Sequence, residues 1–295
     1  MAQTTASTPV ALKSILVATD YSPDSVRAFS FAAALAARFA GRIYALHAGE
    51  PVNYAVPPQL WKEAVELAQR EAVELGRVLH RDFPQIESEV LQEEGPVWQA
   101  VNRVVALRKA DLVVLSTHGR KGMAKFLLGS VAEDILRRAI CPVLCLGPLA
   151  QPWEEVPLAG SEMVFATDFS PESYHAAPQA FAWAAEWNAR LRLLHVLEDD
   201  ARLNFARPLE PADAARRSLE RMLPDGSDSA HFCQLQVSRG EPAEKIVETA
   251  ESLRAPLVIL GVRQPEGFPG AATHLAGSTL HKVISRAPCA VLCAR

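Results

Sequence analysis

The 295-residue chain contains few cysteines, no long hydrophobic run and no large excess of charge of either sign. Five cysteines are too few for the disulfide framework of a small secreted protein, and they are typical of a reducing compartment. The longest apolar run, residues 28–37, contains Ser30 and is too short to span a bilayer. Residues 1–13 lack the pattern of a signal peptide, because their charge follows their weak apolar stretch. We therefore expect a cytoplasmic protein with no membrane segment.

The charge is divided unevenly between the two halves of the chain. Residues 1–150 carry 16 basic and 15 acidic side chains, a net charge of +1, whereas residues 151–295 carry 14 and 19, a net charge of −5. Neither half has the basic excess of a nucleic-acid-binding protein. The chain also lacks a Walker A sequence and the H-E-x-x-H and G-x-S-x-G motifs, so no familiar catalytic motif identifies an enzyme.

The chain does contain a long internal repeat. Asp20, in the segment Ala-Thr-Asp-Tyr-Ser-Pro, corresponds to Asp168, in Ala-Thr-Asp-Phe-Ser-Pro, 148 residues later. A repeat of this length is a duplicated domain, since solenoid repeats are roughly 20–50 residues long. We predict two domains, residues 1–150 and 151–295, with residues 151–159 as the linker. The same spacing relates Gly129-Ser130 to Gly277-Ser278, Cys141 to Cys289 and Cys145 to Cys293.

Both halves alternate short apolar strands with helices. Such strands are typical of a parallel sheet covered by helices on both faces, so we predict two tandem doubly wound α/β domains. The expected helices of the first half are residues 22–40, 58–81, 95–109 and 130–139. The expected strands are residues 14–19, 42–48, 86–91, 111–116 and 142–146 in the first half, and 162–167, 190–196, 231–237, 257–261 and 289–293 in the second.

Two loops of the first half carry residues that suit a phosphate ligand. One follows the first strand and contains Thr19-Asp20; the other, residues 116–122, follows the fourth strand and leads through Gly129-Ser130 into a helix. Ligands of open parallel sheets bind beyond the carboxyl ends of strands, where the strand order reverses. Glycines let backbone N–H groups approach an anion, and a helix start adds partial positive charge. Asp20 is a candidate acceptor for an amine or hydroxyl group.

Each of these features also has a simpler explanation. A Gly-Ser pair often only caps a helix, and an aspartate before Ser-Pro is often only a turn residue. Their presence at corresponding positions of both copies favours a binding site over these alternatives.

The spacing Ser116-x2-Gly119-x9-Gly129-Ser130 resembles the G-x2-G-x9-G-[ST] signature of nucleotide-binding universal stress proteins. The Ala-Thr-Asp segments, the strand ends Leu46-His47 and Leu194-His195-Val196, and the final apolar strands are also similar to that family, over nearly the whole chain. The family implies a five-stranded parallel sheet of order 3-2-1-4-5 in each domain, with ATP between the first and fourth strands. Mg²⁺ would come with the phosphates rather than through protein side chains.

The resemblance also implies which residues of the first copy contact the ligand. Ser116 stands where the family has its first glycine, and we expect less backbone freedom there with the pocket kept. His118 and Gly122 belong to the same loop and are further candidates. Contacts with adenine and ribose are implied for Ala18, Thr19, Asp20 and Ala48, and contacts with ribose and phosphates for Ser116, Gly119, Gly129, Ser130 and Val131.

The second copy departs further from the signature. Its first spacing, Gly261-x5-Gly267, is three residues too long, and the added stretch includes Glu266. Residues 267–276 contain no Lys or Arg, whereas the first copy has Arg120, Lys121 and Lys125. Because an added carboxylate and lost cations disfavour a triphosphate, we expect ATP in the first copy and weak or no binding in the second. The weaker candidate site comprises Asp168, Val196, Gly261, Gly267, Gly277 and Ser278.

Other features leave alternatives open. The two Cys-x3-Cys pairs are expected to be buried apolar residues rather than a zinc site, and His47 and His195 to pack or form hydrogen bonds rather than to catalyse. We expect an ATP-binding stress or regulatory protein; the alternatives are an interaction scaffold without nucleotide and a slow ATPase. The family's final strands pair across a dimer interface, so residues 142–146 and 290–294 are expected to pair within the chain as a pseudo-dimer, with a homodimer also open.

Overall fold

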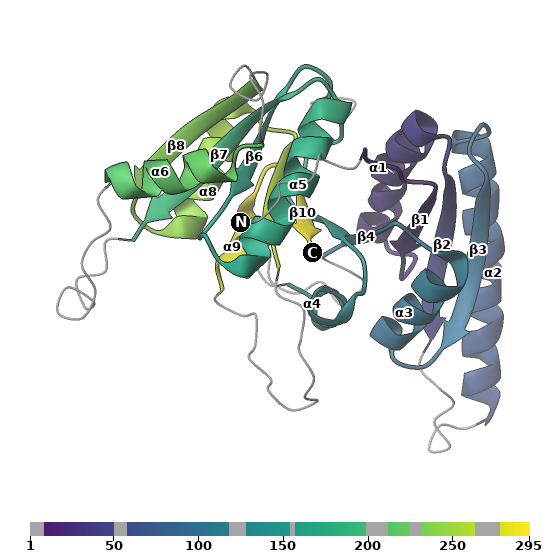
Figure 1. The fold of residues 1–295 in the computed structure, drawn as a ribbon. Coiled ribbons are helices and arrows are strands. Elements are labelled where there is room, and N and C mark those ends of the chain that lie inside the picture. The colour runs from purple at the N-terminus through teal and green to yellow at the C-terminus, as the bar shows by residue number, and fades with distance from the viewer. Residues whose placement is uncertain are drawn as a thin grey trace. The chain divides into compact units, whose positions relative to one another are not determined.

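The computed structural model describes residues 9–49, 58–117, 128–153, 157–198, 212–224, 232–262 and 278–295. These residues form two compact α/β units, whose main segments are Ala11–Pro148, here domain 1, and Leu149–Arg295, here domain 2 (Figure 1). No helix in the described part of the chain is long and apolar enough to cross a membrane.

Domain 1 is built on a parallel sheet with the strand order β3-β2-β1-β4-β5. Because crossovers between parallel strands are right-handed, α1 and α2 cover one face and α3 and α4 the other. The strands are β1 (Ser14–Ala18), β2 (Arg42–Gly49), β3 (Ser88–Glu94), β4 (Leu112–Ser116) and β5 (Val143–Leu146), and the helices are α1 (Pro23–Phe39), α2 (Pro58–Asp82), α3 (Val97–Arg108) and α4 (Ser130–Arg138).

Domain 2 repeats this arrangement with the order β8-β7-β6-β9-β10, again all parallel. The predicted fold, two doubly wound domains of strand order 3-2-1-4-5, is therefore confirmed. The strands are β6 (Glu162–Ala166), β7 (Arg190–Leu197), β8 (Cys233–Arg239), β9 (Leu257–Gly261) and β10 (Ala290–Ala294), and the helices are α5 (Pro171–Glu186), α6 (Ala212–Met222), α8 (Pro242–Leu253) and α9 (Thr279–Arg286).

The cores lie on both faces of the central strands. Ile15, Leu16 and Val17 of β1 are fully buried, which is why these strands are apolar at every position. The edge strands differ from the prediction, since β3 and β8 each begin two residues later than expected and continue to Glu94 and Arg239. An edge strand is covered less, so its hydrogen-bonded ladder continues through polar residues after the apolar pattern has ended.

Part of the expected linker belongs to domain 2. The indole Nε1 of Trp153 donates to the carbonyl oxygen of Pro256 at 3.1 Å, and the indole is buried. The N–H of Gln151 donates to the carbonyl oxygen of Pro288 at 2.9 Å. These bonds fix the start of the segment against the amino ends of β9 and β10.

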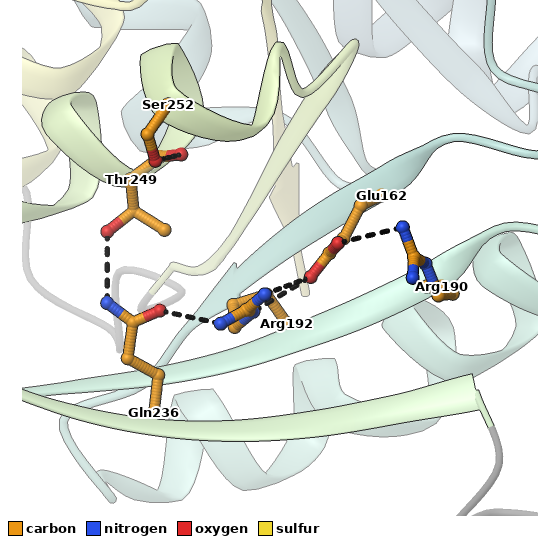
Figure 2. A network of polar contacts seen from close by, with 6 residues as sticks. All are labelled: Glu162, Arg190, Arg192, Gln236, Thr249 and Ser252. Carbon is orange, nitrogen blue, oxygen red and sulfur yellow. Dashed lines mark hydrogen bonds and ion pairs between the residues drawn. The ribbon is translucent and has the colours of Figure 1, made fainter.

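A partly buried polar network ties three strands of domain 2 to α8 (Figure 2). The carboxylate of Glu162, which begins β6 and is 8% exposed, accepts bonds of 2.8 and 2.5 Å from the Arg192 guanidinium on β7. Arg192 also donates to Gln236 on β8 at 3.1 Å, and Gln236 lies 3.5 Å from the hydroxyl of Thr249 on α8. Domain 1 has Ser14, Tyr44, Leu91 and Val104 at the corresponding positions, so the network is specific to domain 2.

Candidate functional site

The candidate residues of domain 1 gather at the carboxyl ends of β1, β2 and β4, here called the carboxyl edge. Ala18 at the end of β1 lies opposite Leu46 of β2 and Leu115 of β4, so β1 and β4 end within one residue of each other, whereas β2 continues to Gly49. Beyond β4, the N–H of Gly129 donates to the carbonyl oxygen of Thr117 at 3.1 Å. This bond brings the start of α4 against the end of β4, beside the loop that follows β1.

A tight turn follows β1 and orients Asp20. The N–H of Tyr21 donates to the Thr19 hydroxyl at 3.0 Å, and the N–H of Ser22 donates to Oδ1 of Asp20 at 3.0 Å. Ser22 then caps α1 by accepting from the N–H of Ser25 at 3.2 Å, with Pro23 at the first helical position. The turn thus fixes the aspartate backbone between a strand end and a capped helix.

The start of α4 is open to an anion. Gly129 is the N-cap and has no side chain to fill the helix end, and Ser130 is the first helical residue. The N–H groups of a first helical turn have no partner within the helix, and the helix dipole makes this end positive. Ser130 and Val131 are exposed among the described residues.

The corresponding helix start in domain 2 is occupied by its own side chain. Ser278 is the N-cap of α9, and its hydroxyl accepts from the N–H of His281 at 3.2 Å. The equivalent serine, Ser130, lies one position inside α4. The two Gly-Ser pairs are identical in sequence, but they therefore stand at different positions relative to their helices.

The serine hydroxyls near the two aspartates form different hydrogen bonds. In domain 1, the Ser25 hydroxyl donates to the carbonyl oxygen of Ser22 at 3.0 Å and lies 2.9 Å from the Thr19 hydroxyl. In domain 2, the equivalent Ser173 hydroxyl donates to Oδ1 of Asp168 at 2.7 Å. Burial alone would raise the pKa of the Asp168 carboxyl, but hydrogen bonds from Ser170 and Ser173 outweigh it and hold that pKa below its ordinary value.

The glycine that ends β9 is required by close packing. A Cβ atom at Gly261 would lie 2.6 Å from the carbonyl oxygen of Glu172 and 2.8 Å from Cα of Ser173, in the first turn of α5. Gly261 does not have a positive φ, so a left-handed backbone is not the reason for a glycine here. The sequence could not show that the first turn of α5 packs so closely against Gly261. It suggested backbone freedom as the reason for the family's glycine at this position. Domain 1 carries Ser116 there, with a Cβ atom.

Several candidates lie outside the described residues. They are His118, Gly119 and Gly122 of domain 1 and Gly267 and Gly277 of domain 2, together with Arg120, Lys121, Lys125, Pro265 and Glu266. Of the remaining candidates, Ala48 lies near the end of β2 and Val196 near the end of β7, each at the carboxyl edge of its own domain.

All five cysteines are buried, and none of them forms a disulfide. Burial raises the pKa of the Cys233 and Cys289 thiols to about 12, so these two are weak nucleophiles. In the parts of the chain that the structure describes, no three His, Cys, Asp or Glu side chains are grouped to hold a metal ion. The described cysteines therefore behave as small apolar residues.

The fold and the carboxyl edge define a class: tandem doubly wound α/β domains, each with an aspartate after its first strand and a helix start after its fourth. The universal stress protein family model matches residues 11–147 and 161–295, and the chain belongs to that family. The predicted family membership, as a tandem pair of domains, is therefore confirmed.

Individual relatives agree with this assignment. A universal stress protein of Methanocaldococcus jannaschii is 31% identical over 138 residues, which are 45% of this chain and 80% of that protein. One of Mycobacterium bovis is 32% identical over 223 residues, 72% of this chain and about two thirds (66%) of that protein. The solved structure of a universal stress protein from Archaeoglobus fulgidus matches with a TM-score of 0.70 over 96% of both chains; at 20% identity it shows the fold.

Proposed function

We propose that domain 1 binds ATP at its carboxyl edge and that the chain is a cytoplasmic ATP-binding stress-response or regulatory protein. Membership of the universal stress protein family supports a general role in stress response. The observation that carries the proposal is the start of α4, where Gly129 caps the helix without a side chain and Ser130 is exposed. A phosphate group would satisfy the open N–H groups of this helix start and would interact favourably with its dipole.

The neighbouring strand ends would hold the rest of the nucleotide. Thr19 and Asp20 follow β1, Ala48 lies near the end of β2, and Ser116 ends β4. The Asp20 carboxylate accepts hydrogen bonds and would therefore suit the ribose hydroxyls or the adenine amine. Mg²⁺ would bind through the phosphates, and we propose no hydrolytic step.

We further propose that domain 2 binds ATP weakly or not at all. Ser278 already occupies the helix start that a phosphate would need, and Ser173 already donates to Asp168. The charge of −5 on residues 151–295 also opposes a triphosphate. These three observations support a working site in domain 1 and an altered one in domain 2.

A matched pair of variants tests the proposal by calorimetric titration of the full chain with ATP and Mg²⁺. Gly129→Asp places a carboxylate at the start of α4, where it fills the anion site and can cap the helix. Its Cβ atom would lie 3.2 Å from the carbonyl oxygen of Thr117, so this neighbour must shift slightly. We expect this variant to bind ATP at least about tenfold more weakly, since a tenfold change requires only 1.4 kcal/mol. The control, Gly277→Asp in domain 2, is expected to bind like the unmodified chain.

Two results would contradict the proposal. The first is an unmodified chain that ignores millimolar ATP, which would favour an interaction scaffold. The second is loss of binding in Gly277→Asp with binding kept in Gly129→Asp, which would place the site in domain 2. ATP turnover by the unmodified chain that Gly129→Asp abolishes would instead support the slow ATPase.

A further inference from the structure

A histidine at the end of the second strand holds the aspartate turn in both domains. In domain 1, Nδ1 of His47 lies 3.0 Å from the carbonyl oxygen of Thr19, and the His47 and Tyr21 rings lie 4.5 Å apart. In domain 2, Nδ1 of His195 lies 2.8 Å from the carbonyl oxygen of Thr167, and the His195 and Phe169 rings lie 4.2 Å apart. The same contacts recur in both copies, although the hydroxyls of Ser25 and Ser173 form different bonds.

The acceptor beside each imidazole determines that Nδ1 carries a proton. A carbonyl oxygen only accepts hydrogen bonds, so Nδ1 must carry a proton and donate. The peptide that accepts from His47 joins Thr19 to Asp20, and the contact therefore acts directly on the backbone that carries the carboxylate. The imidazole holds this peptide from the neighbouring strand, β2.

The turn that the histidine holds is strained. Tyr21 and Phe169 both have a φ of 61°, a left-handed conformation that aromatic residues rarely adopt. In compensation, each N–H donates to the preceding threonine hydroxyl at 3.0 Å, and each ring lies against the histidine. A strained backbone persists only where its surroundings hold it, and such positions cluster at binding sites.

We propose that His47 is a positioning residue of the domain 1 nucleotide site: the hydrogen bond from its Nδ1–H to the Thr19 carbonyl holds the Thr19–Tyr21 turn so that Asp20 faces the ligand. The proposal rests on ATP binding by domain 1 and adds the residue that orders the site. His195 makes the same contacts in domain 2, where we expect no tight nucleotide site, and it therefore serves as an internal control.

Two substitutions separate the hydrogen bond from the ring contact. His47→Asn puts an amide N–H at the position of Nδ1 and removes the ring, whereas His47→Phe keeps a ring beside Tyr21 and removes the donor. The readouts are the ATP affinity of the full chain by calorimetry and its thermal midpoint. We expect His47→Phe to bind about tenfold more weakly and His47→Asn to stay within about threefold of the unmodified chain, since one hydrogen bond accounts for a factor of this size.

The control is His195→Phe, which removes the equivalent bond from domain 2. It is expected to lower the thermal midpoint about as much as His47→Phe and to leave ATP affinity unchanged. The positioning role is overturned if neither His47 variant changes the ATP affinity. It is also overturned if His195→Phe weakens ATP binding as much as His47→Phe does. In both cases ATP binding by domain 1 stands. An unmodified chain that binds no ATP would instead overturn the proposed function. If His47→Phe does not fold, His47→Asn alone still tests the proposal, because it keeps the N–H donor and lacks the ring. A loss of ATP affinity beyond about tenfold in His47→Asn would then show that the donor is not what positions the turn.

Discussion

At the scale of single residues, the two copies use the same side chains for different bonds. Ser25 bonds to Thr19 and Ser22, whereas Ser173 donates to Asp168. In domain 2 the Thr167 hydroxyl instead lies 3.7 Å from the sulfur of Met222 on α6. The sequence could not predict this difference, because Thr-Asp-aromatic-Ser-Pro-acid-Ser occurs in both copies. The contact that differs, from Met222, comes from α6, a helix distant in sequence.

The bond to Asp168 predicts a pH-dependent loss of stability in Ser173→Ala. A carboxyl whose folded-state pKa is lowered stabilises the fold above its unfolded pKa, and this contribution is lost as the pH falls through the folded value. At pH 7 the variant should lose about 0.5–1.5 kcal/mol of unfolding free energy in urea denaturation. The loss should shrink as the pH falls below the ordinary aspartate pKa of about 3.9.

Ser25→Ala is the control for this measurement. Its hydroxyl bonds to Thr19 and Ser22, which carry no charge, so any loss of stability through these bonds should not depend on pH in this range. Equal losses in Ser173→Ala at neutral and acid pH would show that its hydroxyl does not act through the Asp168 carboxylate.

At the scale of elements, the sequence predicted strands and helices well and their ends less well. Apolar runs flanked by Gly, Pro and capping residues predict the central strands, because burial on both faces leaves no other pattern. The helix starts were less predictable: α4 begins at Ser130, but α9 begins after Ser278. Gly129-Ser130 and Gly277-Ser278 are the same dipeptide, so tertiary context decides which residue caps the helix.

The different helix starts predict opposite effects of one substitution. Ser278→Ala removes an N-cap and should lower the unfolding free energy by about 1 kcal/mol, with the ATP affinity of domain 1 unchanged. Ser130→Ala removes a hydroxyl that caps nothing in the described chain; it should leave stability nearly unchanged and weaken ATP binding. Urea denaturation and calorimetric titration of both variants measure the two effects. A larger stability loss in Ser130→Ala than in Ser278→Ala would contradict this assignment of the caps.

At the scale of the whole molecule, the two copies share the fold but differ in contacts at their candidate sites. The strand order, the histidine contacts and the aspartate turn are the same in both domains. The partly buried network around Glu162 and Arg192 and the capping by Ser278 occur in domain 2 at positions where domain 1 has different residues or bonds. The sequence repeat predicted the shared part, whereas these differences depend on contacts between segments distant in sequence. Pairing of the final strands as a pseudo-dimer stays a prediction.

The stoichiometry of ATP binding tests the central claim most directly. Calorimetric titration of the full chain with ATP and Mg²⁺ should show one site for each chain, because among the described residues the helix start of α4 has no side-chain cap, whereas Ser278 caps that of α9. Two sites of equal affinity, or no binding at millimolar ATP, would contradict the account.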